Sequence, residues 1–287
     1  MPEVTLVLGV DAKTLPQFEV SHRTWKLHQP KIWSWPWVVF YDSAIAETFG
    51  SMAVRLVDGG VVPENTMFVA WPDNCLPVDA KAPKYEHQRE KMLSGFPYVA
   101  ADFVRTPWWC KIDTDAICHR ASDWPQDEWF ATLGLPERNG ADAGLPADLP
   151  KIVAPGWNYT KGQNFLGRLE EWGDHTYLND YTRLNIPFDP THLRVPHRRW
   201  CSWNSFYETD WTRWFVGLLE QGGMEAGKLP IPSQDSTMWY AAEREGRFVR
   251  KVNMKKFGWN NYPKLDKLIE AAQSVMRGDA QEAMSDG

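Results

Sequence analysis

The amino-acid sequence predicts a single α/β domain with a mainly parallel central sheet flanked by helices. First, 287 residues with 43% hydrophobic content are enough for a sizeable core. Second, short apolar runs of strand length alternate with segments of helical periodicity in the first half of the chain. Third, three of the apolar runs lead directly into an aspartate: Asp11, Asp42 and Asp113. Ligands of doubly wound sheets bind at the carboxyl ends of the strands, so these acids mark a candidate site.

The elements follow from the same patterns, taken in chain order. Four apolar runs predict buried strands at Thr5–Val10, Trp37–Asp42, Thr66–Trp71 and Trp108–Ile112. Helical spacing predicts helices at Phe18–Leu27, Tyr85–Leu93 and Tyr98–Val104. The Gly-, Pro-, Ala- and Asp-rich stretch Leu133–Pro155 is predicted to be a long surface loop. Beyond it, we predict helices from Thr209 or Asp210 to Leu219, at Gln234–Glu245 and at Leu265–Met276, with a strand at Phe248–Val252.

Composition and charge exclude several classes of function. The formal net charge of -6 argues against a general nucleic-acid-binding protein, which would carry a basic surface. No apolar run approaches the ~20 residues that a membrane-spanning helix needs. The start of the chain lacks the basic and apolar regions of a signal peptide, so we expect a cytoplasmic protein. The four cysteines have no CxxC spacing, which indicates neither a zinc site nor a disulfide framework.

The segment Asp113-Thr114-Asp115 is the most informative motif, because two carboxylates follow a buried strand directly. Burying an unpaired carboxylate costs several kcal/mol, so the pair is expected at an accessible edge. Alternate residues of an extended strand point the same way, and the carboxylates then converge on one divalent cation that can hold a diphosphate. The alternatives are a solvated turn and a phosphohydrolase of the haloacid dehalogenase type. The phosphohydrolase is disfavoured because Ala116-Ile117 lacks the hydroxyl that usually follows in those enzymes.

With the helix around His87–Leu93 before it, the acid pair resembles the nucleotide-binding half of GT-A-fold glycosyltransferases, and Ser233–Tyr240 resembles their later acidic motif. The resemblance extends from about Val4 to Gly258. It implies that Asp113 and Asp115 hold Mn²⁺ or Mg²⁺ on the diphosphate of a nucleotide sugar, with a UDP-sugar favoured. It also implies that Asp11 and Asp42 contact base and ribose. The late histidine ligand of that family is missing, since no histidine follows His197, and Asn253 is a candidate replacement.

Three further residues are candidates for the site. Asp235 is either a general base for the acceptor or an acid that merely stabilises a helix start. Arg89, on the helix before the acid-pair strand, is placed to reach the diphosphate. Trp157, in a loop with Pro155 and Gly156, is either a stacking platform for the acceptor or an aromatic anchor of that loop.

These observations lead to one functional hypothesis and two alternatives. The hypothesis is a metal-dependent glycosyltransferase that moves a sugar from a nucleoside-diphosphate sugar to an acceptor hydroxyl. Residues 1–130 would form the nucleotide-sugar-binding half, residues 131–262 the acceptor-binding and catalytic half of the same domain, and residues 263–287 a C-terminal helix and tail. The alternatives are a nucleotidyltransferase of similar fold, which would release pyrophosphate, and a non-catalytic sugar-binding protein that uses some of the 17 tryptophans.

Overall fold

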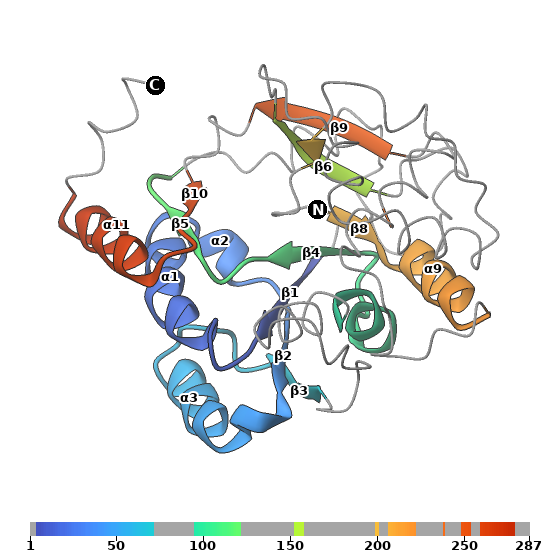
Figure 1. Cartoon of the computed structure of the whole chain (residues 1–287), viewed down its shortest axis with the longest axis horizontal. Coiled ribbons are helices and arrows are strands. Elements are labelled where there is room, and N and C mark those ends of the chain that lie inside the picture. The colour runs from blue at the N-terminus through green and yellow to red at the C-terminus, as the bar shows by residue number, and fades with distance from the viewer. Residues whose placement is uncertain are drawn as a thin grey trace, which may run out of the picture.

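A computed structural model describes residues 4–71, 95–121, 152–157, 199–200, 206–221, 238, 248–253 and 259–278 (Figure 1). Its central feature is an eight-stranded mixed sheet in the order β3-β2-β1-β4-β8-β6-β7, with β9 paired to β6. A separate two-stranded sheet joins β5 (Ala116–Cys118) to β10 (Trp259–Asn261). None of the helices described is long and apolar enough to cross a membrane.

The first half of the chain builds the parallel part of the sheet. Its strands are β1 (Val4–Val10), β2 (Trp37–Asp42), β3 (Met67–Trp71) and β4 (Trp108–Ile112). Strand β1 lies between β2 and β4, and β3 pairs with the outer edge of β2. Because all four strands run in one direction, their carboxyl ends meet at one edge of the sheet. The predicted fold class, a mainly parallel sheet flanked by helices, is confirmed.

The second half adds strands of both directions: β6 (Ile152–Trp157), β7 (Arg199–Trp200), β8 (Phe206–Glu208) and β9 (Phe248–Asn253). Strand β8 pairs antiparallel with β4 and β6, whereas β9 runs parallel to β6. The prediction of a loop through Pro155 is wrong at its end, because Ile152–Trp157 is a strand. Its pairing shifts register between Ala154 and Gly156, and such an irregularity accommodates Pro155, which has no N–H to donate.

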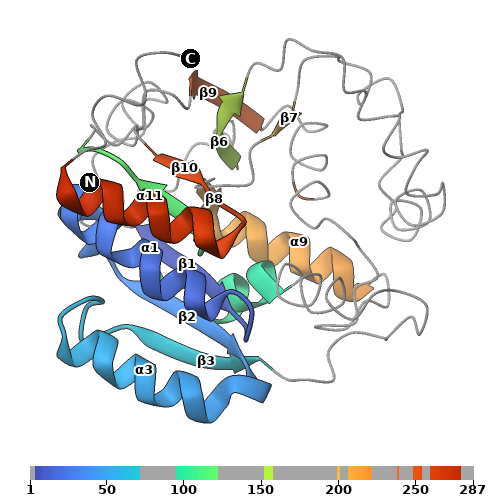
Figure 2. The ribbon, with the colours of Figure 1, turned by 60° about the vertical axis from the view of Figure 1, so that its left-hand side comes forward.

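Helices cover the sheet and the turn that follows β4. They are α1 (Leu15–His28), the short α2 (Pro30–Trp33), the 3₁₀ turn η1 (Ser43–Ile45), α3 (Ala46–Asp58), α9 (Thr209–Gln221) and α11 (Leu265–Arg277), with a further helical segment at 95–103. Helix α11 lies beside α1 (Figure 2). Its buried residues Leu268, Ala272 and Val275 cluster with Ile117 of β5. Gly278, at φ +84°, ends α11 in the left-handed conformation that glycine adopts without strain.

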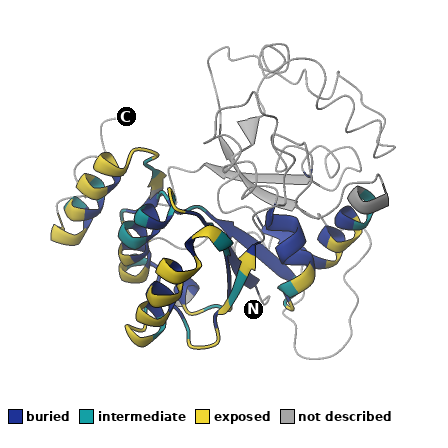
Figure 3. Cartoon of the chain, turned by 60° about the horizontal axis from the view of Figure 1, so that its bottom comes forward, coloured by how far each residue is buried: buried dark blue, intermediate teal, exposed yellow. Residues whose placement is uncertain are grey.

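The core is rich in aromatic side chains. Strands β1, β2 and β4 are buried, the edge strand β3 is partly exposed, and the outer faces of the helices are exposed (Figure 3). The indole ring of Trp33 lies 4.4 Å from that of Trp37 and 6.4 Å from that of Trp25, centroid to centroid. All three are at most 4% exposed, so they are core residues and cannot stack on a sugar. Burial of such large apolar surfaces is the main force that holds this half together.

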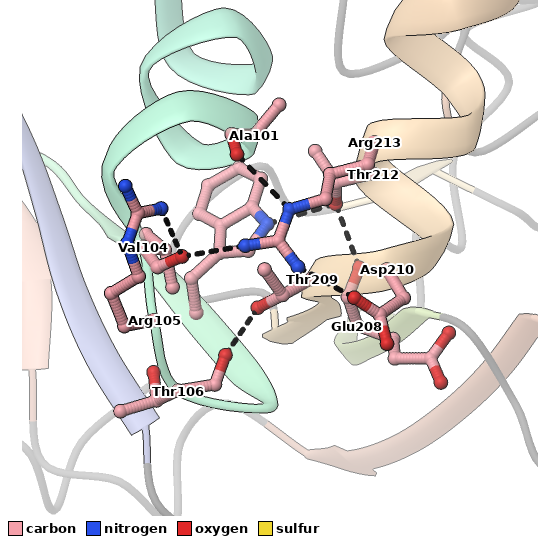
Figure 4. A network of polar contacts seen from close by, with 10 residues as sticks. Ala101, Val104, Arg105, Thr106, Glu208, Thr209, Asp210, Thr212 and Arg213 are labelled. Carbon is pink, nitrogen blue, oxygen red and sulfur yellow. Dashed lines mark hydrogen bonds and ion pairs between the residues drawn. The ribbon is translucent and has the colours of Figure 1, made fainter.

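A polar network attaches β8 and α9 to the rest of the sheet (Figure 4). The guanidinium of Arg213 donates from Nε to the carbonyl oxygen of Ala101 at 3.1 Å and from Nη2 to that of Val104 at 2.9 Å. These carbonyls lie in the last turn of the 95–103 helical segment and just beyond it, where backbone acceptors lack helical partners. Thr209 donates its hydroxyl to the carbonyl oxygen of Thr106 at 2.7 Å. Arg213 therefore acts as a C-terminal cap supplied by another helix.

Candidate functional site

The acid pair directly follows β4, as predicted, but it lies in the turn between β4 and β5 (Ala116–Cys118) and not in the extended conformation from which the shared direction of its carboxylates was predicted. Thr114 is buried between the two acids, and its hydroxyl donates to Oε1 of Gln17 on α1 at 3.3 Å. Asp113 and Asp115, on either side, are both partly exposed. The turn thus anchors its central residue inward and leaves two carboxylates at the carboxyl end of β4, where a charged ligand can reach them.

A strand from the end of the described chain holds this turn. Strand β10 (Trp259–Asn261) pairs antiparallel with β5, and the backbone N–H of Tyr262 donates to the carbonyl oxygen of Asp115 at 2.8 Å. Nδ2 of Asn261 donates to Oδ1 of Asp115, also at 2.8 Å. Gln17 adds a link, since its Nε2 donates to the carbonyl oxygen of Pro263 at 3.1 Å. The orientation of the Asp115 carboxylate is therefore set by residues about 150 positions later.

Asn261 is not among the site residues predicted from the sequence. The predicted replacement for the missing histidine, Asn253, lies in β9, opposite Gly156 of β6. Both β6 and β8 separate that strand from β4 in the sheet order. No local pattern distinguishes Asn261, because its contact depends on a three-residue strand pairing across the fold.

The side chains around Asp115 suit a hard divalent cation. Oδ1 of Asn261 is a buried acceptor that has no hydrogen-bond partner among the residues described, and it shares one carbon with the Nδ2 that donates to Asp115. Leaving a buried acceptor unsatisfied costs about 1–3 kcal/mol, so a hydrogen-bond donor or a cation beside this atom would lower the free energy of the site. Two carboxylates and one amide oxygen are ligands that Mg²⁺ and Mn²⁺ accept, with water and phosphate oxygens completing the shell. Among the residues described, no group of three or more His, Cys, Asp or Glu side chains is placed to hold a metal.

Asp113 has a cationic neighbour. Nζ of Lys111 lies 3.7 Å from Oδ1 of Asp113 and 5.1 Å from the centroid of the Phe96 ring. The Lys111 side chain is 2% exposed, whereas that of Asp113 is 19% exposed. Lys111 was predicted only as part of an apolar strand, and its position beside the acid pair was not predicted. The two acids therefore differ in environment, since one lies beside an ammonium group and the other accepts from a neutral amide.

Asp11 and Asp42 lie at the ends of β1 and β2, as predicted. Both are buried, and each carboxylate accepts hydrogen bonds from backbone N–H groups two or three residues further along the chain. Oδ1 of Asp11 accepts hydrogen bonds from the backbone N–H of Lys13 and from both the N–H and the hydroxyl of Thr14, at 2.7–2.9 Å. Oδ1 of Asp42 accepts from the N–H of Ala44 at 3.0 Å and caps η1. Contacts of these acids with base and ribose stay predictions.

The remaining predicted site residues fall partly or wholly outside the described residues. Arg89 and Asp235 lie outside them. Trp157 ends strand β6, and its backbone pairs with Arg199 of β7, so it does not lie in the loop that was predicted for it. Its role toward an acceptor stays a prediction.

Three titratable side chains that border the turn, Cys110, Cys118 and His119, are neutral at pH 7. Burial, and secondly the charge of Asp113, raises the pKa of the Cys110 thiol well above its usual value. Burial likewise raises the pKa of Cys118 to about 12 and lowers that of His119. Nε2 of His119 lies 3.0 Å from the hydroxyl of Tyr262. Neither thiol is a nucleophile or a metal ligand at neutral pH, because both functions need the thiolate.

No family model matches the chain, and no curated protein matches it. Solved structures do match. Core-mannan synthase A from Aspergillus fumigatus, in its Mn/GDP form, superposes with a TM-score of 0.51 at 10% identity, over 91% of this chain and 75% of that chain. The mannosyltransferase Ktr4p from S. cerevisiae matches at 9% identity with TM-scores of 0.43, and of 0.41 for its GDP complex, over 99% of this chain and 83% of that chain. The first match confirms the GT-A fold that the acid pair predicted.

Proposed function

We propose that this chain is a glycosyltransferase that moves a sugar from a nucleoside-diphosphate sugar to an acceptor hydroxyl, assisted by a divalent cation. One observation carries the proposal: the acid-pair turn follows a parallel strand of a GT-A sheet and lies beside a buried amide oxygen that has no hydrogen-bond partner in the described part of the chain. A divalent cation bound there would neutralise the charge that develops on a leaving diphosphate. Asp113, Asp115 and Asn261 are the residues that would hold it.

The protein's own side chains have distinct parts in this proposal. Asp115 is oriented by Asn261 before any ligand arrives, so little conformational freedom is lost when a ligand binds. Thr114 anchors the turn to α1 through Gln17. Asp235 is proposed to accept the proton of the acceptor hydroxyl, Arg89 to contact the diphosphate, and Trp157 to contact the acceptor.

The donor nucleotide is the first point to test. The family resemblance favours UDP, whereas the two matched proteins have been crystallised with GDP. Calorimetric titrations of GDP and UDP, each with Mn²⁺ and with a chelator, would compare the two. We expect one nucleotide to bind only with the cation, and Asp115→Asn to abolish that binding while the fold survives. Equal binding in chelator, or unchanged binding by the variant, would refute the metal assignment.

Product analysis then tests the reaction class. With the matching nucleotide sugar, the proposal expects the free nucleoside diphosphate as the leaving product, either slowly with water or faster with an acceptor. Release of pyrophosphate would instead identify a nucleotidyltransferase. Sugar binding without turnover and without any dependence on cation would identify a binding protein.

A further inference from the structure

Lys111 is a charged residue inside a strand that is otherwise apolar. Trp108, Cys110 and Ile112 of β4 all belong to the main hydrophobic cluster, and Lys111 alternates with them on the other face of the strand. Its ammonium group lies between the Phe96 ring, 5.1 Å from the ring centroid, and Oδ1 of Asp113, at 3.7 Å. Phe96 is itself held by the ring of Phe40, at 4.9 Å between centroids. The ammonium group of Lys111 therefore lies next to the acid pair, between an aromatic ring and a carboxylate.

Stability does not account for this lysine. Burying an ammonium group is costly, and a buried ion pair can often be replaced by apolar side chains with no loss of stability. A methionine of similar length would fill the space beside Phe96 without that cost. The pair also lies directly at the proposed cation site. A contribution of Lys111 to the charge of that site therefore explains its presence better than a contribution to folding.

The charges of the three side chains give that contribution a direction. Asp113, Asp115 and Lys111 together carry a net single negative charge, and a bound divalent cation turns this into a net single positive charge. Without the charge of Lys111, the two carboxylates and the divalent cation together would be neutral. A positively charged site retains an anionic diphosphate better than a neutral one, and the effect is large where water is partly excluded. The same ammonium group repels a free cation before the nucleotide arrives.

We propose that Lys111 is a positioning residue for the diphosphate of the donor. Its buried ammonium group weakens the binding of a free divalent cation to the acid pair and strengthens the binding of a nucleoside diphosphate to the cation-loaded site. This inference rests on the proposed function. The charge of Lys111 would favour binding of the cation together with the nucleotide over binding of the cation by itself. Lys111 acts here through its charge and needs no direct contact with the sugar.

Two titrations test the proposal on the full chain at one pH. In the first, Mn²⁺ by itself is titrated and the free ion is followed by electron paramagnetic resonance. In the second, GDP or UDP, whichever the wild type binds more tightly, is titrated by calorimetry at saturating Mn²⁺. The variants are Lys111→Met, Lys111→Arg and Lys267→Met, the last a matched loss of one charge on the exposed face of α11. Circular dichroism checks folding, and Lys111→Gln replaces Lys111→Met if the latter does not fold.

The proposal expects opposite changes in the two titrations. Lys111→Met should bind Mn²⁺ about tenfold more tightly and the nucleotide about tenfold more weakly, as one charge a few ångströms away would cause at intermediate dielectric. Lys111→Arg should restore both affinities toward wild type, and Lys267→Met should change neither. Unchanged affinities, or two changes in the same direction, overturn the role of Lys111. A wild type without any cation-dependent nucleotide binding overturns the proposed function itself, so the two failures are distinct.

Discussion

The indole Nε1 of Trp25, on α1, donates a hydrogen bond to the carbonyl oxygen of Ala116 at 2.7 Å, directly after the acid pair. Trp25 is 1% exposed, so water cannot replace this donor. The helix that covers the sheet is thereby fixed to the first residue of β5. The relationship gives one of the 17 tryptophans a defined structural task.

The first prediction concerns this indole. Trp25→Phe keeps an aromatic ring but removes the donor, and an unsatisfied buried carbonyl costs about 1–3 kcal/mol. Urea unfolding should show a loss of that size. Trp214→Phe is the matched control, because Trp214 is 44% exposed and its replacement should change stability by less than about 0.5 kcal/mol. Equal effects at the two positions would contradict the role given to Trp25.

The second prediction concerns Asn261. Asn261→Leu removes the donor to Asp115, and this loss destabilises the fold. It also removes the buried Oδ1, which no described residue satisfies, and this second loss stabilises the fold. We therefore expect the free energy of unfolding to change by less than about 1 kcal/mol. Affinity for Mn²⁺ should nevertheless fall by about 10-fold or more, as is usual when a residue that orients a metal ligand is lost.

Calorimetry and urea unfolding on the same preparation measure the two effects of Asn261→Leu. A large loss of stability with unchanged Mn²⁺ affinity would make Asn261 a structural residue only. Asn260→Leu is a control on the same strand, since Asn260 is exposed.

The third prediction compares two glycines. Gly9 pairs with Phe40 in neighbouring strands, and a Cβ at Gly9 would lie 2.6 Å from Cζ of the fully buried Phe40 ring. Gly9→Ala should therefore destabilise by about 1–3 kcal/mol, as overpacking in a tight core does. At Gly50 on α3 a Cβ would meet nothing within 4 Å, so Gly50→Ala should stabilise by up to about 1 kcal/mol. Thermal melts of both variants check the opposite signs.

The fourth prediction concerns pH. Burial is the main cause that lowers the pKa values of His22, His28 and His119 from 6.5. Below that pH the three histidines bind protons in the unfolded chain but remain neutral in the folded chain, so acid favours unfolding. The free energy of unfolding should be highest at neutral pH and fall between about pH 7 and pH 5.5, before most carboxylates titrate. His28→Leu should make this dependence shallower, and a flat profile for the wild type would contradict the prediction.

Much of the sheet could be predicted from sequence because its strands carry local signals. The predicted strands Trp37–Asp42 and Trp108–Ile112 coincide with β2 and β4, since strands buried on both faces appear as continuous apolar runs. Helix α3 was not predicted, although Phe49, Met52, Ala53 and Leu56 have helical spacing and are buried. The spacing of these four residues is therefore a local signal from which α3 can be predicted.

The site was harder to predict, for physical reasons. Strands β5 and β10 have three residues each, too few for a periodic pattern, and only their mutual pairing makes them strands. The contact between Asp115 and Asn261 crosses 146 positions, so no local motif contains it. Lys111 was predicted within an apolar strand, but its neighbour Phe96 comes from a different element. The sequence located the acids, and the tertiary fold supplied their partners.

The pairing of β10 with β5 has a consequence for protein synthesis. The ribosome makes the acid pair early, but the residues that hold Asp115 emerge only with Asn261 and Tyr262. A nascent chain that ends before residue 259 lacks both hydrogen bonds to Asp115, and it also lacks helix α11, which packs on α1. We therefore expect the proposed cation site to assemble only after translation has passed these residues, and incomplete chains to be without it.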